Sequence, residues 1–494
     1  MTRQTIGLFV GIFLFVLMNI LPVPNGLTPE AMRAGAVTLL MATWWMTEAI
    51  PIFATALVPL ALFPLMDVIS AKTVAANYGH NYVLMLLAGF FIAKAIEVHG
   101  LHKRIALAII QRIGTSRQRL VLSFMVATAF LSMWIANVAV TLLMLPIGLA
   151  VIAREEAASK KQDAFGLTLM LAIAHAASIG GTGTLIGTPP NMVFAGMVKN
   201  LYPAAPEISF FHWMLIGIPL VIVFLPITWL YLVKYHKIEG SFVGSGEVIQ
   251  NEVDALGKMS KAEKRVLIIF IFTALGWIFR RGFTIDQMVI PGWASLLGVE
   301  EMVHDSTVAI VSALIMFLMP SGEGGKRLLD WKSAESVPWG VPLIVGGGYS
   351  IAKGFSETGL ATWIGNELGF ISVLPLFLVL LLVVLFMTFI TEINSNTATA
   401  NIFLPVLATM AIAGQAHPFL LMIPATFACS CAFMLPSGTG PNAVVFGSGR
   451  VTIPQMSRTG LWLNFISVMV VTLVMYLIAI PVFGITSGVP VWAK

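Results

Sequence analysis

The stretch Thr391-Glu392-Ile393-Asn394-Ser395-Asn396-Thr397-Ala398-Thr399-Ala400-Asn401 lies between two strongly apolar runs, residues 374–390 and 402–412. It contains one carboxylate, three amides and four hydroxyls. At membrane depth, each of these polar groups needs a partner, because an unpaired one costs several kcal/mol. The pattern therefore predicts a broken helix whose polar groups line a cavity for an ion or a small substrate.

A weaker copy of this stretch occurs earlier in the chain. Residues 132–146 align with residues 391–405 at one constant offset, which places Asn137 on Asn396. The same offset joins Gly89, Gly100 and Leu101 to Gly348, Gly359 and Leu360, and a nearby offset joins Pro190-Asn191 to Pro441-Asn442. Because these blocks repeat in the same order, the chain is a duplicated unit. Interrupted apolar segments at matching places in two halves point to the binding site of a transporter.

The composition is that of a membrane protein. The chain has 494 residues, of which 58% are hydrophobic and 10% charged, and its mean hydropathy is +0.92. Soluble domains carry about 25% charged residues. Long continuous apolar runs predict an all-α polytopic membrane protein, with residues 6–21 as a first spanning helix rather than a cleaved signal. The net charge of +5 fits basic cytoplasmic loops and does not require nucleic acid as a partner.

The remaining segments divide the chain. Pro51 and Glu48 interrupt the apolar stretch 34–66, and we expect this carboxylate at the membrane interface or hydrogen-bonded in the helix break. Two Gly- and Pro-rich apolar segments, 82–96 and 336–359, fit re-entrant hairpins at least as well as full spans. Basic segments at 102–119, 234–265 and 323–332 are expected in the cytoplasm. We predict N-terminal helices at 1–66, a first repeat at 67–233, a cytoplasmic linker at 234–265, further helices at 266–335 and a second repeat at 336–494.

Two glycine-rich turns accompany the two breaks. They read Gly187-Thr188-Pro189-Pro190-Asn191 and Pro436-Ser437-Gly438-Thr439-Gly440-Pro441-Asn442. Glycine lets the backbone approach a ligand closely, and proline prevents a continuous helix. Neither turn has the Gly-Lys-Ser/Thr ending of a nucleotide-binding loop.

The chemistry of these four elements favours transport of a small anion. Asparagine amides and the hydroxyls of Ser395, Thr397, Thr188 and Thr439 can each donate and accept hydrogen bonds. Exposed helix N-termini attract anions, and unwound carbonyls suit Na⁺, which prefers oxygen ligands. No lysine or arginine lies in these blocks, so a cotransported cation is expected to supply the compensating charge.

Other polar residues give less support to an enzyme. His175 has no acid or nucleophile placed beside it by spacing and is better explained as a packed histidine. Cys429 and Cys431 are interpreted as small buried apolar residues rather than metal ligands. Two roles remain open for Glu392, namely capping the N-terminus of a half-helix and contacting the cargo.

These motifs resemble the divalent anion/sodium symporter family of di- and tricarboxylate transporters. The resemblance covers nearly the whole chain. It implies an inverted-repeat, elevator-type fold with about eleven transmembrane helices, two re-entrant hairpins, a scaffold and a mobile transport domain, assembled as a homodimer in the bacterial inner membrane. It implies sodium symport of C4 dicarboxylates such as succinate, malate or fumarate; the alternatives are a sodium-independent dicarboxylate exchanger and a carrier of citrate or sulfate.

The resemblance also assigns residues. Substrate would contact Asn137, Thr188, Ser395, Asn396, Thr397 and Thr439. One sodium site would use Ser132, Ala136, Asn137 and Gly187, and the other Thr391, Asn394, Asn396 and Gly438. The chain departs from the family pattern where Ala136-Asn137-Val138 replaces the first Ser-Asn-Thr and where Gly440 replaces a proline. The missing hydroxyl at Ala136 is expected to weaken the first sodium site, because a lost polar partner typically costs about 1–3 kcal/mol.

Overall fold

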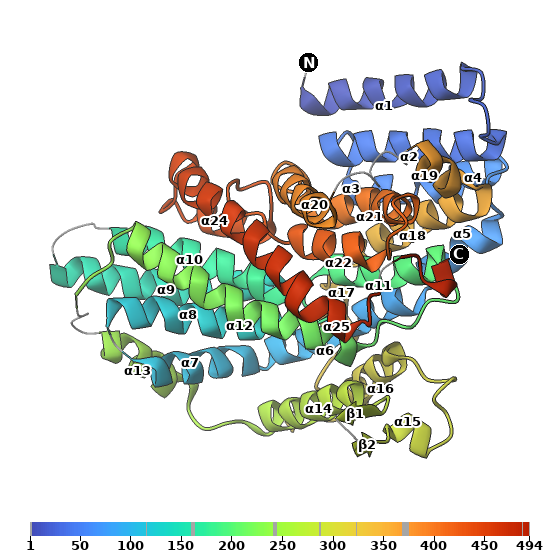
Figure 1. Cartoon of the computed structure of the whole chain (residues 1–494). Helices are drawn as coiled ribbons and strands as arrows, with labels where there is room; N and C mark the ends of the chain where they lie inside the picture. The colour runs from blue at the N-terminus through green and yellow to red at the C-terminus, as the bar shows by residue number, and fades with distance from the viewer. Residues whose placement is uncertain are drawn as a thin grey trace.

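A computed structural model describes residues 2–114, 116–159, 164–240, 245–285, 288–322, 324–367, 375–486 and 488–493. The structure is built almost entirely of helices, which lie roughly along one direction (Figure 1). The first half contains α1 (Arg3–Ile20), α2 (Pro29–Thr47), α3 (Ile52–Thr55), α4 (Val58–Leu65), α5 (Ala71–Tyr78), α6 (Asn81–Val98), α7 (Leu101–Ile113), α8 (Arg117–Ser132), α9 (Asn137–Ser159), α10 (Ala164–Gly181), α11 (Pro189–Leu201) and α12 (Phe210–Tyr235).

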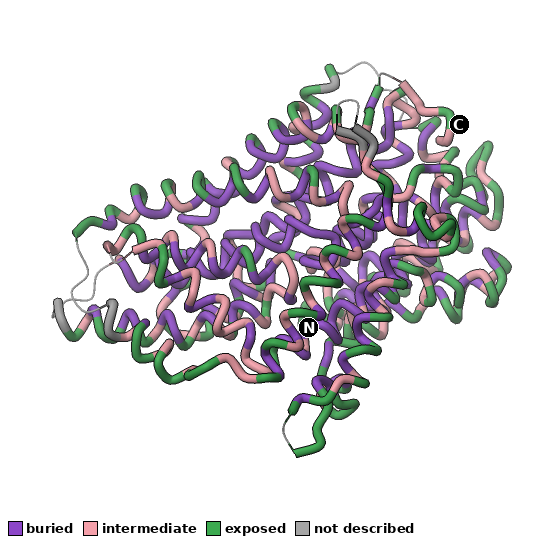
Figure 2. The backbone as a smooth tube through the Cα atoms, turned by 90° about the horizontal axis from the view of Figure 1, so that it is seen from below, coloured by how far each residue is buried: buried purple, intermediate pink, exposed green. Residues whose placement is uncertain are grey.

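The second half follows through the linker helix α13 (Ser245–Leu256). It contains α14 (Lys261–Ile278), strands β1 (Phe283–Ile285) and β2 (Met288–Ile290), α15 (Trp293–Leu296), α16 (Asp305–Leu318), α17 (Trp331–Glu335), α18 (Gly340–Thr358), α19 (Leu360–Glu367), α20 (Leu376–Ile390), α21 (Asn396–Ala413), α22 (Phe419–Ala428), α23 (Gly440–Gly447), α24 (Ile453–Val474), the π-helix η2 (Met475–Ala479), α25 (Ile480–Val482) and the 3₁₀ helix η3 (Val491–Ala493). The two strands pair antiparallel, with Phe283 opposite Ile290. Buried backbone runs along the central helices, and exposed backbone lies on the outer ones (Figure 2).

The expected hairpins lie elsewhere in the chain. Segments 82–96 and 336–359 do not fold back, because α6 and most of 336–359, as α18, each form one uninterrupted helix. The chain reverses instead at the first Asn-centred break, where α8 and α9 lie side by side (Figure 1), and the same tip geometry joins α20 to α21. The glycines and prolines that suggested hairpins in 336–359 are tolerated within and just before α18, where small residues allow close helix packing.

The first helix at each break is shorter than a full span. α8 has 16 residues and α20 has 15, so at 1.5 Å per residue each is about 22–24 Å long, less than a hydrocarbon core of about 30 Å. Seven helices in the described part of the chain are long and apolar enough to cross a membrane, and four shorter apolar helices accompany them. The resemblance implied about eleven spanning helices; fewer meet the length criterion because some helices that end near the site, such as α20 and α22, are shorter than a full span.

The N-terminal break is confirmed, but its acid is not buried. α2 ends at Thr47, Glu48 adopts a left-handed conformation with φ of 52°, and Pro51 precedes α3. The side chain of Glu48 is exposed, which agrees with an interfacial position rather than a packed one.

Segments expected in the cytoplasm meet at one end of the molecule. The linker contains a helix, α13, which packs against α7 and α9. Arg104 on α7 pairs with Glu263 at 2.6 Å, and Lys103 pairs with Glu252 of α13 at 2.8 Å. The linker 234–265 therefore contains a helix and holds the two halves together at that end.

Arg280 and Arg281 follow α14 at the end that is expected outside the cytoplasm, against the positive-inside trend, and a buried charge cluster explains them. Arg280 is fully buried; its Nε lies 2.5 Å from Asp305 Oδ1, and its guanidinium also pairs with Glu207. Arg281 Nη2 lies 2.6 Å from Glu207 Oε2. Burial and the nearby Arg280 lower the pKa of His304 to about 3, so this histidine adds no positive charge. Each arginine is thus neutralised locally, and the pair carries no topological signal.

Candidate functional site

Four helices begin around one cavity of about 440 Å³. α9 starts at Asn137 and α21 at Asn396, and the extended residues Thr188 and Thr439 stand at the N-caps of α11 and α23. The chain can turn so sharply here because glycines and prolines interrupt each apolar segment. Four partial positive charges therefore point toward one place, which favours an anion.

Neutral hydroxyls and amides complete the wall. The side chains of Thr188, Ser395 and Thr439 make no capping hydrogen bond to their own helices, so their hydroxyl groups are free to contact a ligand. Among the described residues that line the cavity, none carries a charge. A bound anion would therefore be held by dipoles and hydrogen bonds, and its charge must be balanced by something that binds with it.

An oxygen cluster lies behind the first hairpin tip. The Ser132 hydroxyl is 2.7 Å from Asn137 Oδ1 and 2.8 Å from the carbonyl oxygen of Ala177. The backbone approaches this cluster closely, because a Cβ added at Gly181 would lie 2.5 Å from Asn137 Oδ1 and 3.1 Å from the carbonyl oxygen of Gly187. Hydroxyl, amide and carbonyl oxygens gathered in this way are ligands that suit a hard monovalent cation.

The second hairpin tip repeats this arrangement. The Thr391 hydroxyl is 2.8 Å from Asn396 Oδ1 and 2.9 Å from the carbonyl oxygen of Cys429. Gly438 again allows a close approach, since an added Cβ there would lie 3.1 Å from the carbonyl oxygen of Glu392. The sequence repeat is therefore also a repeat of the atoms that form the two clusters.

A second pair of asparagines fixes the unwound segments. Asn191 Nδ2 donates to the carbonyl oxygens of Gly181 and Thr184, at 3.2 and 2.7 Å. Asn442 Nδ2 donates to those of Ala432 and Leu435, at 3.1 and 3.0 Å. These amides brace the glycine turns from behind and do not line the cavity.

The carboxylate of Glu392 has a positioning role in the structure. Its Oε1 accepts hydrogen bonds from the backbone N–H groups of Phe433 and Met434, at 2.6 and 2.9 Å, and from Asn464 Nδ2 at 2.9 Å. Its Oε2 accepts from the N–H of Leu435 at 3.1 Å. Of the two roles left open by the sequence, neither is met in full: the carboxylate does not line the cavity, and it holds the unwound segment before α23 rather than the first turn of that helix.

Most predicted site residues meet at the cavity. All six predicted substrate contacts line it, as do Ala136, Gly187 and Gly438. Ser132 and Thr391 stand one layer behind, where each contacts an asparagine of the wall. Asn394 is buried; its Oδ1 accepts from the N–H of Ser395 at 2.9 Å, and its Nδ2 has no hydrogen-bond partner among the residues that the structure describes.

The departures from the family pattern lie against each other. A Cβ added at Gly440 would come within 2.2 Å of Val138 Cγ2. The valine side chain thus fills the space that a larger residue at 440 would need. The two departures form one coupled change in the wall, together with the small side chain of Ala136.

Sequence reasoning missed the wall that faces the two tips. Phe90 of α6, Pro338 before α18 and Val341 in α18 also line the cavity. Their segments take part in the sequence repeat, but the sequence predicted them as hairpins and not as neighbours of the site. His175 is fully buried with its ring edge-on to Phe433, at 5.0 Å between centroids, which fits the predicted packing role.

Comparisons with known proteins agree with this site. The family profile described as "Sodium:sulfate symporter transmembrane region" matches residues 2–485. A sodium-dependent dicarboxylate transporter, SdcS, of Staphylococcus saprophyticus is 42% identical over 99% of this chain and 94% of that protein. SdcS of Staphylococcus aureus strain NCTC 8325 is also 42% identical, with the same coverage.

Two solved structures share the fold at low sequence identity. They are MtrF of Neisseria gonorrhoeae, with a TM-score of 0.61, 11% identity and coverage of 99% of this chain and 97% of that one, and the YdaH transporter of Alcanivorax borkumensis, with a TM-score of 0.56, 14% identity and coverage of 91% and 98%. The duplicated helical architecture, the paired oxygen clusters and the match along nearly the whole length lead to one conclusion. This chain is an integral membrane protein that belongs to the sodium:sulfate symporter family, the divalent anion/sodium symporters that its motifs resemble, and is a transporter rather than an enzyme.

Proposed function

We propose that this protein is a secondary active transporter that couples inward movement of Na⁺ to uptake of a C4 dicarboxylate such as succinate, malate or fumarate. The observation that carries the proposal is the uncharged cavity at which four helix N-termini meet, flanked by two matching oxygen clusters. A dianion in this cavity has no cationic side chain to balance it, so bound sodium ions supply the charge. The names of the 42% identical relatives describe the same pairing of sodium and dicarboxylate.

The two ends of a dicarboxylate would bind to the two tips. One carboxylate would accept hydrogen bonds from Asn137 and Thr188, and the other from residues of the second half. The residues proposed for that second carboxylate are Ser395, Asn396, Thr397 and Thr439. The uncharged, hydroxyl-rich wall would select against a large or cationic substrate.

One sodium ion would bind at each oxygen cluster. The first would use Ser132, Asn137 and the backbone at Ala136 and Gly187, and the second Thr391, Asn396 and the backbone at Asn394 and Gly438. Because Asn137 and Asn396 belong both to a cluster and to the cavity wall, ion and substrate would share a ligand. Sharing a ligand gives a direct route for coupling, since each bound species orients the group that the other needs.

Transport would proceed by an elevator motion. The helices that build the two tips and their braces, α8–α12 and α20–α24, would carry the site past α6 and α18, whose Phe90 and Val341 form the opposite wall. The remaining helices would form the scaffold of a homodimer in the bacterial inner membrane. The basic end with α7 and α13 would face the cytoplasm.

A sodium-independent exchanger is the second candidate, favoured by one observation. Ala136 and Val138 leave the first tip with fewer hydroxyls than the second. If that tip bound no sodium, the carrier would return to its starting conformation only with a second dicarboxylate bound, and it would therefore exchange one substrate for another.

Reconstituted protein can separate these functions. Uptake of labelled succinate is measured in proteoliposomes while external Na⁺ is titrated from zero, with internal succinate present or absent. Sodium-dependent uptake into empty vesicles is the expected result. Uptake that ignores Na⁺ and requires internal succinate would establish the exchanger, and no succinate-competable uptake under any gradient would overturn the dicarboxylate assignment.

A further inference from the structure

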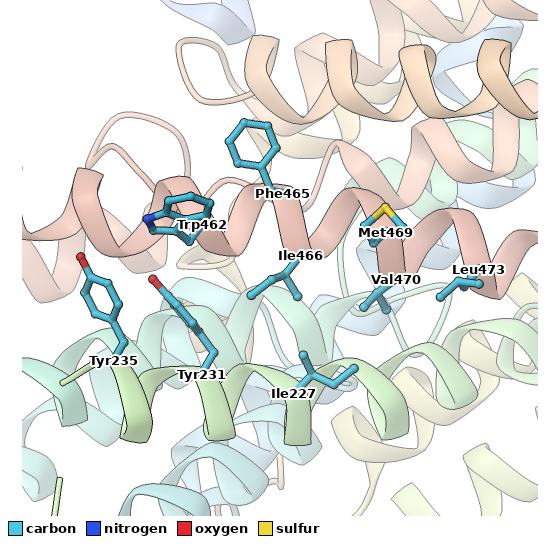
Figure 3. A pocket seen from close by; sticks show the side chains of 9 residues that line it. All are labelled: Ile227, Tyr231, Tyr235, Trp462, Phe465, Ile466, Met469, Val470 and Leu473. Atoms are coloured by element: carbon cyan, nitrogen blue, oxygen red, sulfur yellow. The ribbon is translucent and has the colours of Figure 1, made fainter. Parts of the chain in front are cut away.

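An apolar groove of about 740 Å³ lies between α12 and α24, apart from the candidate site. In Figure 3, Ile227 and Tyr231 of α12 lie opposite Ile466 and Val470 of α24, while Phe465 points away from α12. The lining residues recur at four-residue steps on α12 and at three- and four-residue steps on α24, so they form one stripe on each helix. The groove therefore extends along two helices that have the length and apolar character of membrane spans.

The groove opens toward the bilayer. Trp462, Met469 and Leu473 keep 57%, 52% and 52% of their surface exposed. Apolar side chains so exposed on a spanning helix face the hydrocarbon of the membrane, where acyl chains are the neighbouring molecules.

One end of the groove is built for the membrane interface. Tyr231, Tyr235 and Trp462 gather there (Figure 3), and the hydroxyl of Tyr231 donates to the carbonyl oxygen of Thr459 at 2.8 Å. Amphipathic aromatic rings concentrate at the level of lipid headgroups. The other end, at Leu473, is entirely aliphatic.

Positive charge lies just beyond the aromatic end. Arg458 is four residues before Trp462 and therefore on the same face of α24, and Lys234 is three residues after Tyr231 on α12. Both are exposed, as is Lys237 at the C-terminal end of α12. One exposed acid, Glu239, follows these residues, so the local excess is positive.

Two acids of α9, which packs against α23, are already paired. Glu155 of α9 pairs with Arg117, and Glu156 pairs with Arg450 at 2.5 Å. This end belongs to the basic side of the molecule, which is expected in the cytoplasm. Anionic headgroups are attracted to basic pockets between spanning helices on that side.

We propose that this groove is a binding site for an anionic glycerophospholipid of the surrounding bilayer. One acyl chain lies between α12 and α24, from the aromatic end toward Leu473, and the phosphate lies among Lys234, Lys237 and Arg458. Because both helices pack against each other beside the hairpin elements, the lipid stabilises their contact where α24 also holds Glu392 through Asn464.

A second copy of the chain does not fit the same face. In a two-fold dimer within a membrane the axis follows the membrane normal, so equivalent residues meet at equal depth. The cationic ends of the two grooves would then stand opposite each other and repel. A molecule with one negative end and one apolar tail matches the groove without this conflict.

Native mass spectrometry of the purified full-length protein, titrated with phosphatidylglycerol or with phosphatidylcholine of the same acyl chains, tests the proposal. Wild-type protein should retain one phosphatidylglycerol per chain with at least tenfold preference over phosphatidylcholine. Met469→Trp, which fills the groove at an exposed position, should lose that lipid, whereas Ile222→Trp, an exposed position on α12 outside the groove, should retain it.

A second variant separates the headgroup from the chain. Lys234→Gln with Arg458→Gln alters exposed residues only, so the protein should fold, and the preference for phosphatidylglycerol should fall several-fold. Equal retention of both lipids by the wild type would mean bulk lipid only and would overturn the proposal. The same holds if Met469→Trp retains the lipid, or if Met469→Trp changes the oligomeric mass, which would identify the groove as a contact between copies.

Discussion

The two hairpin tips share their ion-binding geometry but differ in what supports it. In each tip a hydroxyl, an asparagine Oδ1 and a carbonyl oxygen from a neighbouring helix lie within 2.7–2.9 Å contacts, around Ser132 and Asn137 in one and Thr391 and Asn396 in the other. Behind the second tip stands the carboxylate of Glu392, and the matching position in the first tip is Met133. The oxygen cluster that both tips share indicates what ion binding requires. The difference between Glu392 and Met133 shows that the two halves support this cluster with different groups.

The supporting acceptors differ in kind, because they are backbone carbonyl oxygens in the first half and a side-chain carboxylate in the second. In the first half, the carbonyl oxygen of Met133 accepts from the Thr184 hydroxyl, and that of Thr182 accepts from Trp213 Nε1 at 3.0 Å. In the second half, Glu392 accepts from three backbone N–H groups and one amide. The Glu392 carboxylate lies beside Gly438, whose added Cβ would lie 2.9 Å from Glu392 Oε2, and the four hydrogen bonds that it accepts favour its ionised form. We therefore expect the second tip to bind Na⁺ more strongly than the first.

The largest effect is expected from replacing Asn137 or Asn396, which occupy matching positions in the two tips. Asn396→Ala removes an ion ligand and a substrate donor together, so sodium-driven succinate uptake should fall at least 100-fold. Asn137→Ala should do the same if both tips are needed. Uptake in proteoliposomes is compared with that of Asn19→Ala, a surface asparagine bonded only to its own helix, and circular dichroism checks the fold. Wild-type uptake by Asn396→Ala would show that the site is misplaced.

The site could be predicted from the sequence because its chemistry is local. Polar residues within apolar runs, such as Asn137 and Asn396, have few structural explanations at membrane depth, and their duplication made the signal specific. Whether the chain continues or reverses at each break could not be predicted from the local sequence. A kinked span and a hairpin tip require the same glycine, proline and polar residues, so nothing in residues 132–146 distinguishes them. Only the packing of α8 and α9 on α10 decides it.

Long-range partners were beyond the sequence for the same reason. The bonds from Glu392 to Phe433 and Asn464 join residues far apart in the chain, as does the contact of Val138 with Gly440. Spacing along one helix predicts a shared face, but it carries no information on which unwound segment lies opposite.

Removing the charge behind the second tip should have the next largest effect. In Glu392→Gln an acceptor oxygen becomes an NH₂ donor that faces backbone N–H groups, and hydrogen bonds to a charged group contribute about 1.5–3 kcal/mol each. The melting temperature in detergent should fall by several degrees. Uptake should fall about tenfold or more, and the Na⁺ concentration for half-maximal uptake should rise. Met133→Leu, at the matching position, serves as the control and should leave both unchanged. An unaltered melting temperature in Glu392→Gln would remove the distinction between the tips.

The contact between the first tip and the second glycine turn can be tested through Val138 and Gly440. Gly440→Ala should reduce uptake because its Cβ would meet Val138 Cγ2 at 2.2 Å, and a valine side chain has little freedom to move away. Val138→Ala in the same protein should restore much of the activity, with a coupling energy of about 0.5–3 kcal/mol between the sites. Gly440→Ala, Val138→Ala and the double variant are compared with the wild type by initial rates at saturating Na⁺. Purely additive losses would mean that the two departures are independent.

The smallest effect is expected from a substitution that makes the first tip more like the second. Ala136→Ser adds a hydroxyl at the cavity wall beside Asn137, where the second tip has Ser395. One additional ligand or hydrogen bond contributes about 0.5–1.5 kcal/mol, so the Na⁺ concentration for half-maximal uptake should fall about two- to tenfold. The reverse change, Ser395→Ala, should raise it by a similar factor. An increase in affinity would place an impaired sodium site at the first tip, whereas no change in Ala136→Ser would mean that this site is absent or is formed by the backbone and Ser132 alone, and that the second tip carries the sodium dependence.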